Sequence, residues 1–171
     1  RDDLVTGVQT CALPISAQRQ EAAAQERRER KRVADLLAQT ERDELEAAWE
    51  ALPSKPVVQP VRGPETGLVM VRGRIGGGGS PFNLGEVTVT RATIRLASNT
   101  IGHAHALGTD REKARLSAIF DALWQQPATR DFVEKAVLQP VTQRIADYDR
   151  KRAEETAATR VDFFTMVRGD D

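Results

Sequence analysis

The 171-residue chain has almost no cysteine, since Cys11 is the only one. A lone thiol forms no disulfide within the chain and supplies no cysteine cluster for zinc or an iron–sulfur group. No apolar run approaches the roughly 18 residues that a membrane-spanning helix needs. Basic and acidic residues balance at 25 each, which disfavours a general nucleic-acid binder. These absences favour a cytoplasmic protein that binds neither nucleic acid nor membrane.

The first 16 residues, "RDDLVTGVQTCALPIS", have the character of foreign sequence. They lack the basic start and the unbroken apolar run of a signal peptide. No histidine lies nearby to activate Cys11 as a nucleophile. Val5–Ile15 corresponds instead to the translation of a common high-throughput sequencing adapter. We therefore expect residues 1–16 to be a disordered, adapter-derived artefact. Without them the cysteine disappears, and the balance becomes 24 basic to 23 acidic residues, because Arg1, Asp2 and Asp3 are removed.

The remaining residues, about 155 in number, suit one domain. Residues 17–32 are strong helix formers without an apolar stripe, which predicts a polar helical extension. From Val33 onward apolar residues recur at helical spacing, so residues 33–171 are expected to form a single domain. A capping signal at Thr40 predicts a second helix, and Pro53 should end it.

Three segments rich in valine, threonine and isoleucine predict strands at residues 66–75, 85–98 and 100–108. Short turn signals separate them, which favours an antiparallel β-meander. Within the second segment the apolar alternation slips, because Val87 and Val89 differ in parity from Ala92 and Ile94. A bulge near Thr90–Arg91 would explain the slip. Burial of both faces, one of them by a partner, would explain it equally well.

Helices are expected to follow the strands. Thr109 with Glu112 resembles a capping box, and a regular apolar stripe from Leu116 to Trp124 should lie on the sheet. A shorter helix should end at Pro140, and a long polar arm comes after it. The predicted fold class is therefore α+β. It consists of an antiparallel meander of about three or more strands packed against helices, with helical N- and C-terminal arms.

The stretch "RGRIGGGGSPF" (72–82) invites comparison with phosphate-binding loops. It lacks the Gly-Lys-Ser/Thr sequence of a P-loop, and a strand rather than a helix is expected to follow. We therefore expect an exposed hairpin loop from about Ile75 to Glu86, in which at least one of Gly76–Gly79 has a positive φ. Backbone contact with a ligand or partner is the alternative.

His103 and His105 should share one face of a strand. Two histidines are too few for a zinc site unless a carboxylate completes it, so no metal is expected. No catalytic residue and no cofactor site can be identified by spacing. The candidates for ligand or partner contact are the arginines and glycines of the first two strands and one acid, namely Arg74, Gly76, Gly77, Glu86 and Arg91. Solvated ion pairs across the strands, with Glu86 for example, are the alternative.

The chain ends in an apolar cluster, "VDFFTMVRGDD", after the polar arm. This pattern predicts a docking segment at residues 160–171, in which Phe163, Phe164, Met166 and Arg168 contact another subunit. Burial of the same residues against this chain's own sheet is the alternative, and the sequence leaves both open.

Four blocks of the sequence carry a family resemblance. They are "PETGLVMVRGRIGGGGSPFNLGEVTVTRATIRL" (64–96), "GHAHALGTD" (102–110), "IFDALWQ" (119–125) and "RVDFFTMVRGD" (160–170). In sequence and order they resemble the G subunit of the carbon–phosphorus lyase system, the PhnG family. The likeness covers most of the chain from about Val33 onward.

The resemblance implies a cytoplasmic subunit of a complex that degrades organophosphonates. Its expected partners are the H, I and J subunits, with the K and L ATPase-like proteins associated. The complex is expected to transfer alkylphosphonate onto ribose C1 of MgATP with release of adenine, which yields ribose 1-methylphosphonate 5-triphosphate. MgATP is then a substrate of the complex, and this chain alone is expected to bind no cofactor.

Two main roles fit the resemblance. In the first, the chain is an assembly or accessory subunit, not catalytic alone. In the second, it contributes ligand-contacting residues such as Arg74, Arg91 or the glycine loop to a shared active site. A third role, an independent metalloprotein built on His103 and His105, has less support.

Overall fold

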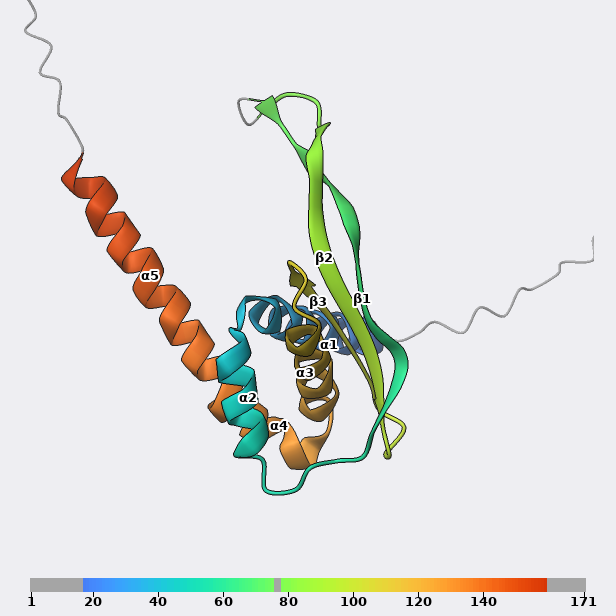
Figure 1. The fold of residues 1–171 in the computed structure, drawn as a ribbon. Helices are drawn as coiled ribbons and strands as arrows, with labels where there is room; N and C mark the ends of the chain where they lie inside the picture. The colour runs from blue at the N-terminus through green and yellow to red at the C-terminus, as the bar shows by residue number, and fades with distance from the viewer. Residues whose placement is uncertain (1–16, 76–77, 160–171) are drawn as a thin grey trace, which may run out of the picture. The chain divides into compact units, whose positions relative to one another are not determined.

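The computed structural model describes residues 17–75 and 78–159, and the expected adapter-derived residues 1–16 lie outside this range. Figure 1 shows a sheet of three antiparallel strands, in the order β1-β2-β3, together with helices. The α+β prediction is confirmed. The chain divides into two compact units, Arg1–Arg32 and Val33–Asp171. No helix within the described residues is long and apolar enough to cross a membrane.

Helix α1 spans Ala17–Gln39. Within the first unit, no side chain from residue 19 to residue 32 is buried, and most are exposed. This helix has no apolar stripe there, so its backbone hydrogen bonds and helix-forming residues must maintain it. In the second unit, Val33 and Leu37 of the same helix are fully buried in the core.

The sheet consists of β1 (Val58–Gly73), β2 (Phe82–Leu96) and β3 (Ile101–Leu107). The predicted antiparallel meander is confirmed, although β1 begins eight residues before the expected start at residue 66. A tight turn joins β2 to β3, with Asn99 at φ 66° and the Leu96 amide donating to the Thr100 carbonyl at 2.9 Å. Asparagine tolerates this left-handed conformation better than most residues.

The irregularity of the sheet lies in β1, so the bulge expected near Thr90–Arg91 is wrong. β2 pairs with β3 without a register shift from Val89 to Arg95. The shifts fall between Pro60 and Arg62, between Arg62 and Glu65, and between Val71 and Arg72. The alternation of β2 therefore stays regular past Thr90. Val87 and Val89 point to the face of the sheet opposite Ala92 and Ile94.

A strand, not the helix of a phosphate-binding P-loop, follows the glycine-rich stretch, as expected. Ser80 and Pro81 lead directly into β2, which starts at Phe82, earlier than the expected Glu86. Gly76 and Gly77 lie outside the described residues. Gly78 and Gly79 have no positive φ, since Gly108 is the only glycine in the described part of the chain that does.

Two helices flank the strands in sequence: α2 (Arg42–Glu50) before them and α3 (Arg111–Trp124) after them. In both helices the cap lies one residue later than predicted, at Glu41 and at Asp110. At α2 a capping box joins Glu41 and Glu44, whereas Thr40 is buried and donates to the Leu36 carbonyl. At α3 the Asp110 side chain, not Thr109, accepts the Lys113 amide. In both cases the cap is the acidic residue next to the predicted threonine.

The C-terminal helical region is α4 (Pro127–Val133), the π-helical turn η2 (Glu134–Leu138) and α5 (Gln139–Ala158). The expected helix end at Pro140 is wrong, because Pro140 occupies the first turn of α5, where a missing N–H costs least. The Trp124 indole donates to Glu134 at 2.7 Å, and Arg130 stacks on the same ring at 4.4 Å. These contacts hold α4 and η2 against α3.

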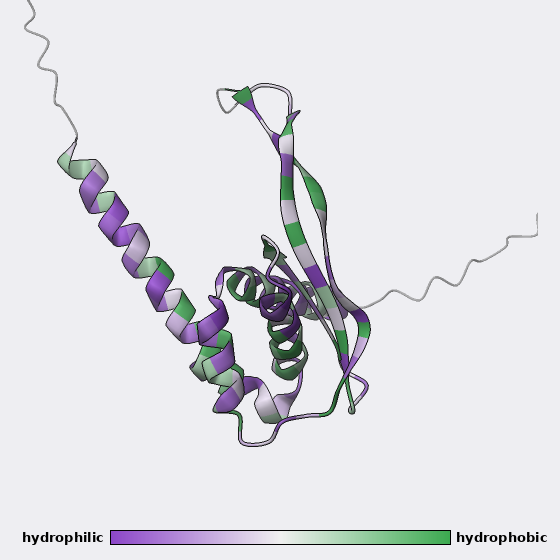
Figure 2. Cartoon of the chain, in the orientation of Figure 1, coloured by the Kyte–Doolittle hydropathy of each residue, from purple (hydrophilic) through white to green (hydrophobic). Residues whose placement is uncertain are grey.

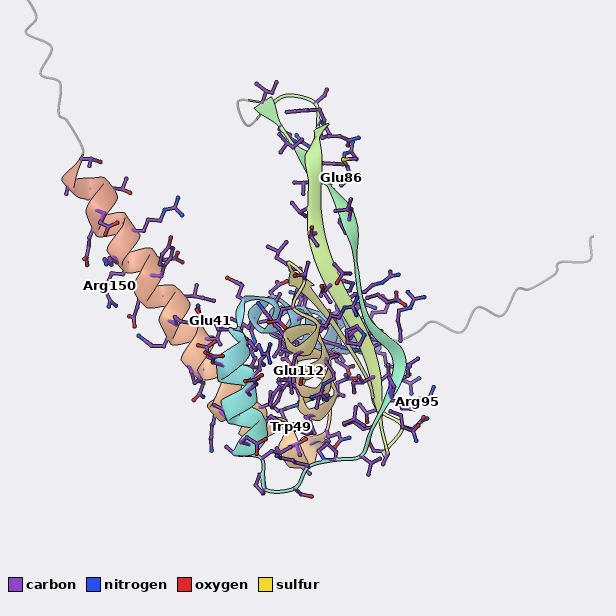
Figure 3. All side chains as sticks on the ribbon, in the orientation of Figure 1. Glu41, Trp49, Glu86, Arg95, Glu112 and Arg150 are labelled. Atoms are coloured by element: carbon purple, nitrogen blue, oxygen red, sulfur yellow. The ribbon has the colours of Figure 1, made fainter. Side chains whose placement is uncertain are left out.

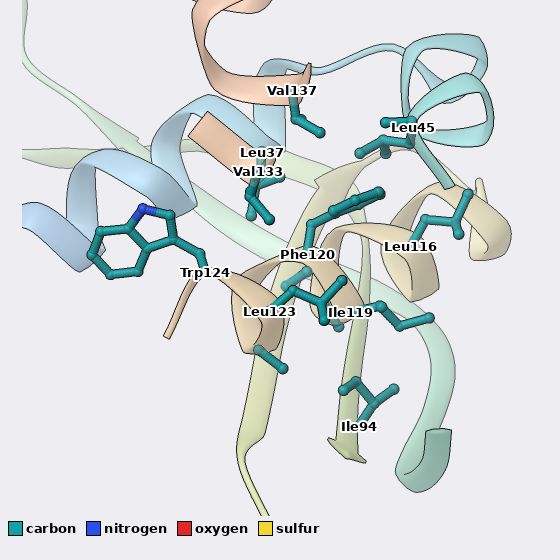
Figure 4. Close-up of a cluster of buried hydrophobic side chains, with 14 of the residues drawn as sticks. Leu37, Leu45, Ile94, Leu116, Ile119, Phe120, Leu123, Trp124, Val133 and Val137 are labelled. Atoms are coloured by element: carbon teal, nitrogen blue, oxygen red, sulfur yellow. The ribbon is translucent and has the colours of Figure 1, made fainter. Parts of the chain in front are cut away.

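The core is aliphatic, as the low aromatic content predicts, with one fully buried phenylalanine at its centre (Figure 4). Phe120 of α3 lies among side chains from α1, α2 and η2, including Leu37, Leu45 and Val137. The other side of α3 faces the sheet, where Ile94 of β2 is buried. Helix α3 is therefore the central element, with every residue from Leu116 to Trp124 buried.

Helix α3 packs unusually close to β3. A Cβ added at Gly102 would overlap the Ala118 carbonyl oxygen and lie 2.9 Å from Ala122 Cβ. One turn farther along, the buried Asp121 carboxylate accepts the His103 amide at 2.8 Å. Only glycine leaves room for a backbone contact of this kind.

We therefore expect Gly102→Ala to destabilise the protein by about 1–3 kcal/mol, since backbone must shift to admit the methyl group. Chemical denaturation measures the effect. Gly85→Ala is the matched control in the same sheet, because a Cβ at Gly85 meets nothing within 4 Å. That variant should change the unfolding free energy little, and equal losses in the two variants would contradict the close-packing argument.

Arg144 of α5 fastens this helix to the start of α2. Its guanidinium donates to both carboxylate oxygens of Glu44, at 3.0 and 3.1 Å, and to the Gln39 carbonyl at 2.8 Å. Burial acts to raise the pKa of Glu44, but hydrogen bonds from Arg144 and from the Glu41 amide outweigh it, so the pKa is lowered. A carboxyl whose pKa is lowered by folding stabilises the folded state above its ordinary pKa, and this contribution is lost in acid.

Arg144→Gln should consequently lower stability at neutral pH, by no more than about 1 kcal/mol because the pair is partly exposed. The difference from the parent protein should shrink as pH falls below the ordinary glutamate pKa of about 4.3. Unfolding measured from pH 7 to pH 3 tests this, with Arg150→Gln as a control for an exposed arginine on the same helix. A difference that is constant across this range would contradict the role of Glu44.

Candidate binding surfaces of the sheet

One face of the sheet is covered by α3 and the other, here called the outer face, is not (Figure 1). On β2 and β3 the covered face consists of small and aliphatic residues that are buried: Ala92, Ile94, Leu96, Ala104 and Ala106. The residues that alternate with them point to the outer face, and most are polar: Arg91, Thr93, Arg95, His103 and His105, beside the apolar Val89, Ile101 and Leu107. Strand pleating therefore places arginines and histidines together on the face of the sheet opposite α3.

The strand register aligns Glu65, Arg91 and His105 across β1, β2 and β3. Arg91 Nη2 lies 3.2 Å from Glu65 Oε2, and Arg62 Nε lies 3.8 Å from the same oxygen. All three ion-pair partners are about half exposed, so solvent screens the pairing. This row is a polar strip across the outer face with two cations, one anion and one imidazole.

The predicted placement of His103 and His105 on one face is confirmed, since both are exposed and Ala104 between them is buried. The Thr93 hydroxyl lies 3.1 Å from His103 Nδ1. No group of three or more histidine, cysteine, aspartate or glutamate side chains that could hold a metal occurs within residues 17–75 and 78–159. The two histidines therefore lie beside the arginines of the outer face, and they belong to no metal-holding group among these residues.

The other candidate contact residues lie elsewhere. Arg74 is exposed beyond the end of β1, and Gly76 and Gly77 lie outside the described residues. Glu86 pairs with Met70 and, by strand alternation, points to the face opposite Arg91. Figure 3 shows Glu86 in the part of β2 far from the helices, whereas Arg95 lies at the other end of that strand. The structure thus brings Arg91 together with Glu65 and His105, and not with Arg74 or Glu86.

Beyond the end of β3, β1 and β2 continue as a two-stranded extension, residues 68–73 and 82–88, here called the ribbon. The ribbon carries large apolar side chains that are 37–66% exposed: Leu68, Val69, Met70, Phe82, Leu84 and Val87. Figure 2 shows hydrophobic segments along this part of both strands. Consecutive residues Leu68, Val69 and Met70 are all exposed, so apolar groups occupy both faces.

Sequence reasoning missed Glu65 and Gly67, and it raised the two-faced ribbon only as one of two explanations of the slipped alternation. The signal for the ribbon was present as the slipped alternation, together with the unbroken run Leu68–Val71, because a strand that is apolar at both parities has no polar face. No sequence signal pointed to Glu65 or Gly67. Their importance depends on a register that passes through two irregularities of β1.

Comparisons with known proteins agree with the resemblance found in the sequence. The family model described as "Phosphonate metabolism protein PhnG" matches residues 28–169. The alpha-D-ribose 1-methylphosphonate 5-triphosphate synthase subunit PhnG of Rhizobium meliloti (strain 1021) is 60% identical over 151 residues, which cover 88% of this chain and 94% of that protein. The chain therefore belongs to the PhnG family of phosphonate metabolism proteins.

Proposed function

We propose that this chain is the G subunit of an alpha-D-ribose 1-methylphosphonate 5-triphosphate synthase and that its main role is assembly. The relative from Rhizobium meliloti bears that name and is described as a subunit. The observation in the structure that supports an assembly role is the ribbon, which presents apolar side chains on both faces. Exposed patches of this kind are characteristic of surfaces that a partner covers.

The energetics of the ribbon favour a covered state. A two-stranded hairpin without a packed face is only marginally stable in water. Six large apolar residues at the observed exposures offer several hundred Å2 of apolar surface, and burial is worth about 25 cal/mol per Å2. A stable interface buries ~800 Å2 per partner, so these side chains suit the apolar centre of such an interface and not the whole of it. We propose that the ribbon lies between surfaces of one or more other subunits of the complex.

In this proposal the partners are the H, I and J subunits of the carbon–phosphorus lyase complex, with the K and L ATPase-like proteins associated. MgATP is a substrate of the assembled complex, and the chain acts in the cytoplasm. The chain is not catalytic alone. Support comes from the family membership and from the relative in Rhizobium meliloti, which is described as a subunit.

Exchanging ribbon residues for threonine tests the proposal, since threonine keeps strand propensity while it removes apolar area. Leu68→Thr with Met70→Thr should weaken complex assembly about 10- to 100-fold and leave the melting temperature of the isolated chain nearly unchanged. Both side chains are already 66% and 47% exposed in that chain. Co-expression with the other subunits, followed by co-purification and affinity measurement, is the assay.

Val57→Thr with Val61→Thr is the matched control. These valines are 67% and 51% exposed but lie outside the ribbon. The control should assemble like the parent protein. Normal assembly of the Leu68/Met70 variant, or equal losses in both variants, would overturn the role of the ribbon.

The C-terminal docking segment stays a prediction, because Phe163, Phe164, Met166 and Arg168 lie outside the described residues. Phe163→Ala with Phe164→Ala should weaken assembly and abolish growth on phosphonate while barely lowering the melting temperature of the isolated chain. Fully burying such a side chain is worth roughly 1.5–3 kcal/mol, which is enough to anchor an interface. If the double substitution instead unfolds the isolated chain, while the folded fraction still assembles normally, the segment belongs to this chain's own core.

A further inference from the structure

A hollow of about 260 Å3 lies on the outer face of the sheet, where the ribbon meets the part of the sheet that β3 completes. The polar row of Glu65, Arg91 and His105 lines one side of it. Its floor is formed by Gly67 of β1 and Val89 of β2, which are paired in register. The hollow therefore has an apolar floor and a charged wall.

Nothing in the fold explains a glycine at position 67. A Cβ added there meets no atom within 4 Å, and Gly67 has no positive φ. Glycine in the interior of a strand costs roughly 0.5–1 kcal/mol relative to alanine. Such a glycine often marks a place where a ligand or another backbone approaches closely. A side chain at this position would fill the hollow, so Gly67 is what keeps it open.

The charged wall is suited to an oxyanion. Arg91 and Glu65 form the ion pair in the lining, and Arg62, which lies outside the lining, is 3.8 Å from the same carboxylate. Two cations therefore lie around one anion. Only one of the five guanidinium N–H groups of Arg91 is engaged by a described residue, at Glu65. The remaining N–H groups can form the paired hydrogen bonds that arginine gives to phosphate and phosphonate groups. Glu65 fixes the position of Arg91 and can accept a hydroxyl or amine of the same ligand.

We propose that this hollow binds a small organic phosphate or phosphonate, with its oxyanion on Arg91 and His105 and its neutral part over Gly67 and Val89. The choice of a phosphorus oxyanion over a carboxylate rests on the proposed function. The hollow and its charges are observed independently of that function. In the assembled complex, Arg91, His105 and Glu65 then contact ligand.

The binding test uses the full isolated chain and NMR. Methylphosphonate and ATP are each titrated to about 10 mM at constant ionic strength, because salt screens exposed charges. The amide signals of Gly67, Val89, Arg91 and His105 should shift in a saturable way with at least one of these probes. Acetate is the carboxylate control and should bind at least 10-fold more weakly.

Three variants locate the site. Gly67→Val should abolish the shifts without lowering the melting temperature, since a valine fills the hollow and suits a strand. Arg91→Gln should weaken binding at least 10-fold. Gly85→Val is the matched control and should bind like the parent, because it adds the same side chain at an unconstrained glycine of the neighbouring strand, β2.

The proposal is overturned if neither probe shifts these amides, if acetate binds as well as the phosphorus compounds, or if Gly67→Val still binds. It is also overturned if the amides respond only to added partner subunits, since the outer face is then a protein contact. Failure of the assembly role is recognised separately. In that case the Leu68/Met70 variant assembles normally, whatever the hollow binds.

Discussion

The close contact between β3 and α3 at Gly102 is the constraint on which the rest of the second unit depends. The absence of a side chain lets the strand lie against the backbone of Ala118 and Ala122. Asp121 then reaches the His103 amide, and Phe120 on the far side of α3 can pack against the other helices. One helix thereby serves as both the cover of the sheet and the centre of the core.

This arrangement covers one face of the sheet and leaves the other open. Because α3 covers only the part of the sheet that includes β3, the longer β1 and β2 extend beyond α3 as the ribbon. The outer face collects the polar residues of the alternating strands, whereas the ribbon collects apolar residues on both faces. Two chemically different surfaces thus lie next to each other, one suited to an anion and the other to a protein partner.

Much of the fold could be predicted because local chemistry repeats at fixed periods. Alternating valines and threonines indicated the meander, and the stripe from Leu116 to Trp124 indicated α3 as the helix on the sheet. The boundaries were less accurate. The helix caps are the acidic residues next to the predicted threonines. Pro140 lies in the first turn of α5, after a π-helical turn that no residue propensity indicates. Competing caps differ by too little free energy for sequence to choose between them.

The sequence by itself determined the α+β class, the aliphatic core, the shared face of His103 and His105, and the family, because periodicity and long specific motifs are local properties. Only the tertiary structure decided that Arg91 meets Glu65 and His105 while Glu86 points away. That outcome depends on where the irregularities of β1 shift the register, and a shift by one residue reverses the face of every side chain beyond it.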